Sequence, residues 1–140
     1  MTRSSAAPGA PTMNNIELIE ALYASFRSGD HARFAELCHD DLEWIQNDGF
    51  PYGGRHVGPA NVVTGVFETL ARHWDGFGFD DDEMLEAGTH VTVVGSYRGT
   101  HRESGRSFRA ATVHLFDVVD GRVKRFRQFT DTAVVRDAVG

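Results

Sequence analysis

The chain has 140 residues, of which 41% are hydrophobic, so it is long enough for one domain with a real core but too short for a separate cofactor-binding domain. Its formal net charge is −6 and its basic residues are scattered, which argues against the clustered positive surface that nucleic acids require. The single cysteine, Cys38, excludes an intramolecular disulfide and suits a reducing compartment, so we expect a cytoplasmic protein.

The first twelve residues differ in composition from the remainder of the chain. Residues 1–12 are rich in Ser, Ala, Pro and Gly and contain no apolar run that could form the core of a signal peptide. We expect a disordered tail there and a single domain at 13–140, with either Met1 or Met13 as the natural start. The sequence suggests neither a nucleic-acid partner nor a membrane partner.

Three helices are predicted in the first half of the chain. Asn14, with Glu17 three residues on, forms a capping-box pattern before apolar residues at helical spacing, and Gly29 ends this helix. Asp30 can cap a second helix, and Pro59 stands at the first position of a third. The apolar positions of the three helices are Ile16, Ile19, Tyr23 and Phe26; Phe34, Leu37 and Cys38; and Val63, Phe67, Leu70 and Trp74.

Strands dominate the second half of the chain. A short strand at 42–46 and an aromatic loop at 47–54 precede the third helix, and four strands joined by turn signals follow it. The turn at Asp120-Gly121 is the strongest hairpin signal. Helices followed by hairpin-connected strands predict an α+β fold, in which an antiparallel, curling sheet carries the helices on one face. The four strands are predicted at 83–87, 90–101, 107–119 and 122–131, with a brief closing helix at 131–139.

The strand predicted at 107–119 has two largely apolar faces. His114 and Phe116 lie on one face, and Val113 and Leu115 lie on the other. The helices can cover only one face of the sheet, and an apolar second face normally packs against a partner. We therefore expect a homodimer formed through the open sheet face.

Five short sequences, in the order of the predicted elements, carry a family resemblance. They are Ser28-Gly29-Asp30, Asp41-Leu42-Glu43-Trp44, Arg55-His56-Val57-Gly58, Val119-Asp120-Gly121-Arg122-Val123 and Phe126-Arg127-Gln128-Phe129-Thr130-Asp131-Thr132. In this order and spacing the chain from Met13 onwards resembles the SnoaL-like superfamily, relatives of ketosteroid isomerase and of nuclear transport factor two.

The resemblance implies a cone-shaped domain whose curved antiparallel sheet holds the three helices of the first half on its concave face. It also implies a mouth that admits a small, mostly apolar molecule, usually without a cofactor. Members of the superfamily include isomerases, polyketide cyclases, epoxide hydrolases, dehydratases and non-catalytic binding modules. The fold therefore does not name the reaction.

Departures from the steroid isomerases narrow the choice of reaction. Leu22 falls where those enzymes carry their tyrosine, and Tyr23 is one residue away, which rotates it by roughly 100° on a helix. Gln46 falls near the position of their general-base aspartate, so we do not expect true ketosteroid isomerase activity. His114 lies close to the place of their second oxyanion-hole acid. Asp131, just after the last strand, resembles the acid-base aspartate of polyketide cyclases.

His114 and Asp131 are the candidate catalytic residues. His114 shares its strand face with Thr112 and Phe116, so it should point into a semi-apolar interior, where a neutral imidazole can donate or accept one proton. Alternatively, it is a hydrogen-bonded core histidine. Asp131 could be a carboxylate held among apolar walls and used for acid-base chemistry near neutral pH. Alternatively, its side chain caps the closing helix.

The pocket walls are expected to be mainly aromatic. Phe50 and Tyr52 lie in a glycine-rich loop that has no core of its own, which suggests a pocket lip. Arg127 and Gln128 alternate on the last strand, and we expect Gln128 to face inward because an unpaired buried guanidinium would be costly. The candidate substrate-binding residues are Trp44, Phe50, Tyr52, Phe67, Gln128 and Phe129.

No metal and no other cofactor is expected. The histidines show no paired-ligand spacing, and no glycine-rich loop could cradle a phosphate. The acidic run from Asp80 to Glu83 lacks the ligand spacing of a calcium loop, so we interpret it as a solvated acidic turn.

The leading hypothesis is a cofactor-independent enzyme of the isomerase or cyclase type, acting by proton transfer on a small apolar carbonyl or polycyclic compound. Asp131 would move the proton, and His114, helped by Tyr52 or Gln128, would stabilise the developing enolate oxygen. One alternative is epoxide hydrolysis on the same fold, which requires an Asp-Arg-Asp arrangement that holds a water molecule. Arg127 and Asp131 are candidates for two of its three members. The other is a non-catalytic module that binds a small ligand or forms dimers.

Overall fold

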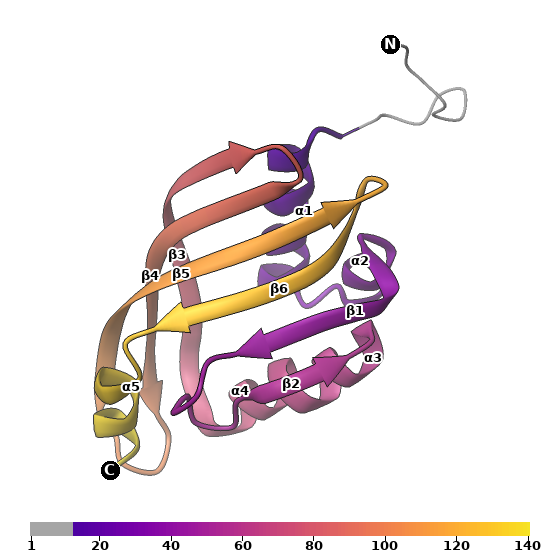
Figure 1. The fold of residues 1–140 in the computed structure, drawn as a ribbon. Coiled ribbons are helices and arrows are strands. Elements are labelled where there is room, and N and C mark those ends of the chain that lie inside the picture. The colour runs from indigo at the N-terminus through magenta and orange to yellow at the C-terminus, as the bar shows by residue number, and fades with distance from the viewer. Residues whose placement is uncertain (1–12) are drawn as a thin grey trace.

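A curved six-stranded sheet with helices on one side forms the frame of the protein (Figure 1). The computed structural model describes residues 13–140, and the tail predicted at 1–12 lies outside the described residues. In chain order the elements are α1 (Asn15–Ser28), α2 (His31–Glu36), β1 (Cys38–Gln46), β2 (Gly54–Val57), α3 (Pro59–Val62), the π-helix η1 (Val63–Phe67), α4 (Glu68–His73), β3 (Trp74–Ala87), β4 (His90–His101), β5 (Ser107–Val119), β6 (Arg122–Thr130) and α5 (Thr132–Val139).

The first two helices begin where the sequence predicts. The Asn14 side chain accepts a hydrogen bond from the backbone N–H of Glu17 (2.8 Å), and the Glu17 carboxylate accepts one from the N–H of Asn14 (3.0 Å), which forms the expected capping box. Gly29 ends α1 in the left-handed conformation (φ 70°), and Asp30 caps α2. Helix α2 is shorter than predicted, because Cys38 already belongs to β1.

The third predicted helix is one helical run from Pro59 to His73 with the π-helical turn η1 in its middle. Gly65 lies in this turn, where a Cβ atom would come within 2.7 Å of Nδ1 of His56. Glycine at this position therefore allows η1 to pack closely against His56 of β2. Trp74, predicted as the last apolar position of this helix, instead begins β3.

The strand order in the sheet is β2-β1-β6-β5-β4-β3. Neighbouring strands are antiparallel except β1 and β6, which run parallel. Strands β4 and β5 have the predicted bounds, and β6 ends at Thr130, one residue before the predicted end. Strand β3 begins at Trp74, well before the predicted segment at 83–87, and β2 adds a short edge strand after the aromatic loop.

The core lies between the concave face of the sheet and helices α1 to α4 (Figure 1). Buried and partly exposed residues alternate along β5, with His114 and Phe116 buried, as predicted. The mixed α+β architecture with helices on the concave face is therefore confirmed. Helix α5 packs at the end of β4 and β5. None of the helices in residues 13–140 combines the length and the apolar character that crossing a bilayer demands.

Candidate functional site

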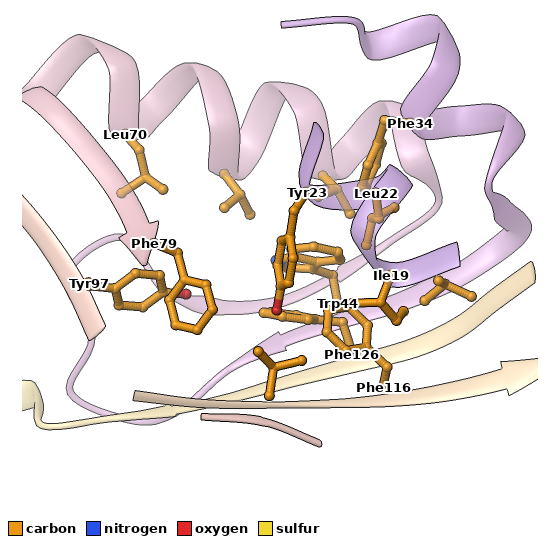
Figure 2. Close-up of a cluster of buried hydrophobic side chains, with 14 of the residues drawn as sticks. Ile19, Leu22, Tyr23, Phe34, Trp44, Leu70, Phe79, Tyr97, Phe116 and Phe126 are labelled. Atoms are coloured by element: carbon orange, nitrogen blue, oxygen red, sulfur yellow. The ribbon is translucent and has the colours of Figure 1, made fainter. Parts of the chain in front are cut away.

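A small cavity lies between α1, the π-turn η1 and the concave face of the sheet. Its volume is about 40 Å³, which is room for about three water molecules. Aromatic side chains make up most of its wall, and Figure 2 shows many of them gathered between α1 and the sheet. The sequence-predicted residues Trp44, Phe67 and His114 all line this cavity.

A hydrogen-bonded relay of three side chains forms the polar part of the wall. The Tyr23 hydroxyl lies 2.8 Å from Nδ1 of His114, and the Tyr97 hydroxyl lies 2.8 Å from Nε2 of the same ring. The three residues come from α1, β5 and β4, and all three are buried. Both tyrosine hydroxyl groups point into the middle of the aromatic cluster in Figure 2. The sequence pointed to His114 but missed both tyrosines.

The relay is electrically neutral at pH 7. Burial lowers the pKa of His114 to about 3, so its imidazole is uncharged. Burial also raises the pKa of Tyr97 above its ordinary range; burial, followed by unfavourable electrostatic interactions of a Tyr23 phenolate with Tyr97 and Asp81, raises the pKa of Tyr23. A neutral imidazole has one N–H and one acceptor nitrogen. One tyrosine therefore donates to the ring, and the other accepts from it and keeps its own O–H free for a ligand.

Ring packing fixes the imidazole in this relay. The Phe79 ring stacks on His114 with centroids 4.0 Å apart, and Phe126 meets it edge-on at 4.7 Å. Trp44 in turn stacks on Phe126 at 3.7 Å, and Phe67 meets Trp44 edge-on at 5.6 Å. These contacts hold the hydrogen-bonding groups in one geometry within an apolar enclosure, which strengthens their electrostatic effect.

Two amide side chains lie beside the relay on the concave face. Gln128 is buried and faces inward, whereas Arg127 faces the other side of the sheet, 3.6 Å from Asp117. The inward position predicted for Gln128 is thus observed. Gln46 on β1 also lines the cavity. Several polar atoms of these amides have no hydrogen-bond partner among the described residues.

An open groove of about 930 Å³ leads to the cavity from outside. Six side chains line both spaces and separate them: Tyr23, Phe26, Phe67, Leu70, Phe77 and Phe79. The cavity in this closed form is much smaller than common ligand pockets. A passage from the groove into the cavity therefore requires that some of these six side chains move.

The acidic run at 80–83 corrects a sequence interpretation. It lies inside β3 rather than in a turn, and Asp80 and Asp81 both line the groove. Asp80 accepts hydrogen bonds from Arg98 (3.0 Å) and Arg109 (3.1 Å), which hold its pKa below the usual range. Asp81 lines the groove together with Tyr23, and its charge contributes to the raised pKa of that tyrosine. Asp81 is thus a carboxylate near the relay.

The structure places Asp131 away from the cavity. Its side chain is exposed and accepts a hydrogen bond from the backbone N–H of Val134 (3.3 Å), which makes it the N-cap of α5. The chain leaves the sheet at this point, with the Asp131 N–H still bonded to the carbonyl of Ala111. This position corrects the expectation of a pocket acid. Arg127 also faces away, so the Asp-Arg-Asp arrangement expected for epoxide hydrolysis is not assembled around the cavity.

Four predicted wall residues also lie outside the cavity lining: Gln128, which faces inward but does not reach it, and Phe129, Tyr52 and Phe50. Phe129 is 49% exposed on the convex face of the sheet, because Gln128 takes the inward position beside it. Tyr52 is 38% exposed and stacks on His73, with centroids 4.3 Å apart. Phe50 is buried but packs against Tyr97 from outside the cavity, with centroids 5.9 Å apart. The aromatic loop thus supports the wall without forming its lip.

Within residues 13–140, no cluster of three or more His, Cys, Asp or Glu side chains could hold a metal ion. The cavity instead offers neutral hydroxyl, imidazole, indole and amide groups among aromatic rings. Such a set can hold an uncharged ligand and can stabilise negative charge that develops on a ligand oxygen.

Comparisons with known proteins agree with this fold. Residues 19–126 match the family model of the SnoaL-like domain. An NTF2-like protein from Burkholderia thailandensis is 34% identical, with a TM-score of 0.84 over 88% of this chain and 95% of that chain. TerC, co-crystallised with polyporic acid, is 26% identical, with a TM-score of 0.80 over 89% of this chain and 97% of that chain.

A more distant structure shares the fold alone. IdmH from Streptomyces antibioticus, proposed to be a polyketide cyclase, is 18% identical, with a TM-score of 0.77 over 91% of this chain and 99% of that chain. No curated protein matches the sequence.

Proposed function

Because the chain belongs to the SnoaL-like domain family, we propose that it is a cofactor-independent enzyme of the isomerase or cyclase type. Its substrate in this proposal is a small, mainly apolar carbonyl compound that enters the cavity through the groove. The observation that carries the proposal is the Tyr23–His114–Tyr97 relay, which presents one free hydroxyl donor inside an aromatic enclosure. TerC, a relative co-crystallised with a small molecule, supports ligand binding on this fold.

Tyr23 is the free donor in this mechanism. Tyr23 lines both the groove and the cavity, whereas Tyr97 lines the cavity alone, so an entering carbonyl oxygen meets Tyr23 first. His114 then donates from Nδ1 to the Tyr23 oxygen and accepts the Tyr97 proton at Nε2. Handing the Tyr23 proton to the substrate would leave a phenolate at Tyr97, which burial opposes. The relay therefore stabilises an enolate by hydrogen bonding and does not protonate it.

Asp81 is the proton acceptor in this proposal, in place of Asp131. The proton leaves the carbon next to the carbonyl, the electron pair of that C–H bond moves toward the oxygen, and Tyr23 holds the resulting enolate. The position of Asp81 supports this role, because Asp81 lines the groove together with Tyr23. The carboxylate of Asp80, in contrast, forms ion pairs with two arginines. Return of the proton to a different atom completes an isomerisation.

The proposal is tested with 2-tetralone, a bicyclic ketone whose acidic C–H positions exchange with solvent when an enolate forms. Exchange in D₂O, followed by NMR, should be faster with the wild-type protein than without it. Tyr23→Phe removes the free donor and should lower this exchange rate about a hundredfold. Tyr52→Phe is the matched control, because that hydroxyl lies outside the cavity, and it should leave the rate unchanged. Equal rates in Tyr23→Phe and wild type would contradict the mechanism.

The second candidate function is non-catalytic binding of a small ligand. It is favoured by one observation: no carboxylate is among the described residues that line the inner cavity. In that case 2-tetralone should bind, as measured by calorimetry, without any gain in exchange rate. The two functions are therefore distinguished by the same probe.

We further propose that two copies of the chain associate through the convex face of the sheet. Val94, Val113 and Phe129 are register neighbours on this face, and Phe129 is exposed there. Helices α1 to α4 cover the opposite side (Figure 1). Apolar side chains gathered on an open sheet face are typical of an interaction surface.

Light scattering at micromolar concentration should give the mass of a dimer for the wild-type protein. Phe129→Glu should yield a monomer, because it places a charge within the apolar surface. Ala35→Glu, an exposed apolar-to-acidic change on α2, is the control and should remain dimeric. A monomeric wild-type protein would remove the proposal.

A further inference from the structure

Three polar side chains form a row across the concave face of the sheet. His114 on β5 is the register partner of Gln128 on β6, and Gln128 is the register partner of Gln46 on β1. Their exposed fractions are 4%, 1% and 4%, respectively. Three polar residues in register, on strands about 4.8 Å apart, lie side by side on one face. The row therefore runs from His114 in the tyrosine relay, through Gln128, to Gln46 in the cavity wall.

The hydrogen-bonding groups of His114, the outer member of this row, all have partners, whereas those of Gln128 and Gln46 do not. Both ring nitrogens of His114 have tyrosine partners. In contrast, both amide atoms of Gln128, Oε1 of Gln46 and Nε1 of Trp44 have no hydrogen-bond partner among the described residues. Gln46 and Trp44 line the cavity directly. Buried polar atoms in native proteins are nearly always hydrogen-bonded, so this end of the cavity is built for a polar group that is not part of the chain.

The unpartnered atoms define the chemistry of that group. The N–H groups of Trp44 and Gln128 can only donate, and the amide oxygens of Gln46 and Gln128 can only accept. A carbonyl would satisfy the donors alone, whereas a hydroxyl both donates and accepts. No arginine or lysine is among the described residues that line the cavity, so a carboxylate or a phosphate would be desolvated without a counter-charge.

We infer that the inner end of the cavity, lined by Gln46 and Trp44 with Gln128 beside Gln46 in the sheet, binds a neutral hydroxyl group of the substrate. The substrate class is then a cyclic or aromatic ketone with a hydroxyl group on the opposite side of the ring from the carbonyl. This inference rests on the proposed function, in which Tyr23 holds the carbonyl oxygen. Tyr23 is hydrogen-bonded to His114, whose strand lies two strands, about 10 Å, from that of Gln46, so the two ends of the site are separated on the scale of one ring with an oxygen at each end.

The test compares two probes that differ only in the hydroxyl group. The dissociation constants of 4′-hydroxyacetophenone and acetophenone are measured by calorimetry for the wild-type protein and for the double variant Gln46→Met and Gln128→Met. The wild-type protein should bind the hydroxylated ketone at least tenfold more tightly. In the double variant this preference should disappear while acetophenone binds at least as well as before, because methionine keeps the length of glutamine without its polar atoms.

Controls separate the inference from a loss of structure and from the proposed function. Thr112→Val, a buried polar-to-apolar change on the same face but outside the cavity lining, should keep the hydroxyl preference. The midpoint of thermal unfolding of the double variant should be no lower than that of the wild type. Equal binding of both probes by the wild-type protein, or a preference that survives in the double variant, would overturn the inference and leave the proposed function standing. Failure of both probes to bind would overturn both.

Discussion

The free energy of unfolding of the wild-type protein should fall by roughly 4 kcal/mol more than that of His114→Gln as the pH is lowered from 7 to 3. The cause is the buried imidazole, whose pKa is lowered by burial to about 3 in the folded protein. In the unfolded chain a histidine has a pKa of about 6.5. Above pH 6.5 the imidazole is neutral in both states, and it makes no pH-dependent contribution.

Below pH 6.5 only the unfolded chain takes up this proton, so stability is lost until the folded protein also becomes protonated near pH 3. Gln is the matched substitution, because its amide can donate to one tyrosine and accept from the other but does not titrate. Urea unfolding of both proteins at several pH values between 7 and 3 measures the difference, since their carboxylates contribute equally. Parallel stability curves would show that His114 is not held neutral in the fold.

Asp81→Asn should lower the rate of 2-tetralone exchange by roughly 10²–10⁴-fold, the range typical for removal of a general base. The amide keeps the shape of the carboxylate and removes its capacity to accept a proton. Because Asp81 is exposed and lies on the groove, the thermal unfolding midpoint should change little. NMR in D₂O, with the same probe as for Tyr23→Phe, gives the rate.

Asp131→Asn is the control for this experiment, because it tests the carboxylate that sequence reasoning favoured. Asparagine caps a helix about as well as aspartate, so α5 should remain intact. Asp131 is exposed and lies away from the cavity, and exchange should proceed at the wild-type rate. A loss of exchange in Asp131→Asn, with none in Asp81→Asn, would reverse the assignment and return the proton transfer to the end of β6.

The bounds of a strand could be predicted from the sequence wherever every second side chain along that strand is buried. Strands β4 and β5 alternate between buried and at least partly exposed positions along most of their length, and their bounds match the prediction. Strand β3 lacks this signal, because its register shifts between Asp75 and Gly78 and again between Asp81 and Glu83. Each shift moves the following side chains to the other face, so the period of two is lost and the acidic run resembled a turn.

The candidate site was predictable only in part, because its geometry depends on how helices pack on the sheet. The alternation along β5 was enough to place His114 inward. Tyr23 was discounted because it stands one position from the expected site on α1, yet α1 lies on the sheet with Leu22 and Tyr23 both buried. Sequence spacing fixes the angle between residues on a helix but not the rotation of that helix against its neighbours. For Asp131 the sequence was equally compatible with a pocket acid and with a helix cap. The chain leaves the sheet at this residue, which makes Asp131 the N-cap of α5.

The parallel pairing of β1 with β6 also bears on how the protein is made. Trp44 on β1 and Phe126 on β6 are register partners, although more than half of the chain separates them. During synthesis β1 emerges early from the ribosome and must wait for the end of β6 before its inner edge is paired. Contacts of such long sequence separation form slowly, and an unpaired strand edge is open to association with other chains in the meantime. The nascent chain therefore depends on late completion of its sheet, and a ribosome that stalls before residue 122 would hold a chain that cannot close its core.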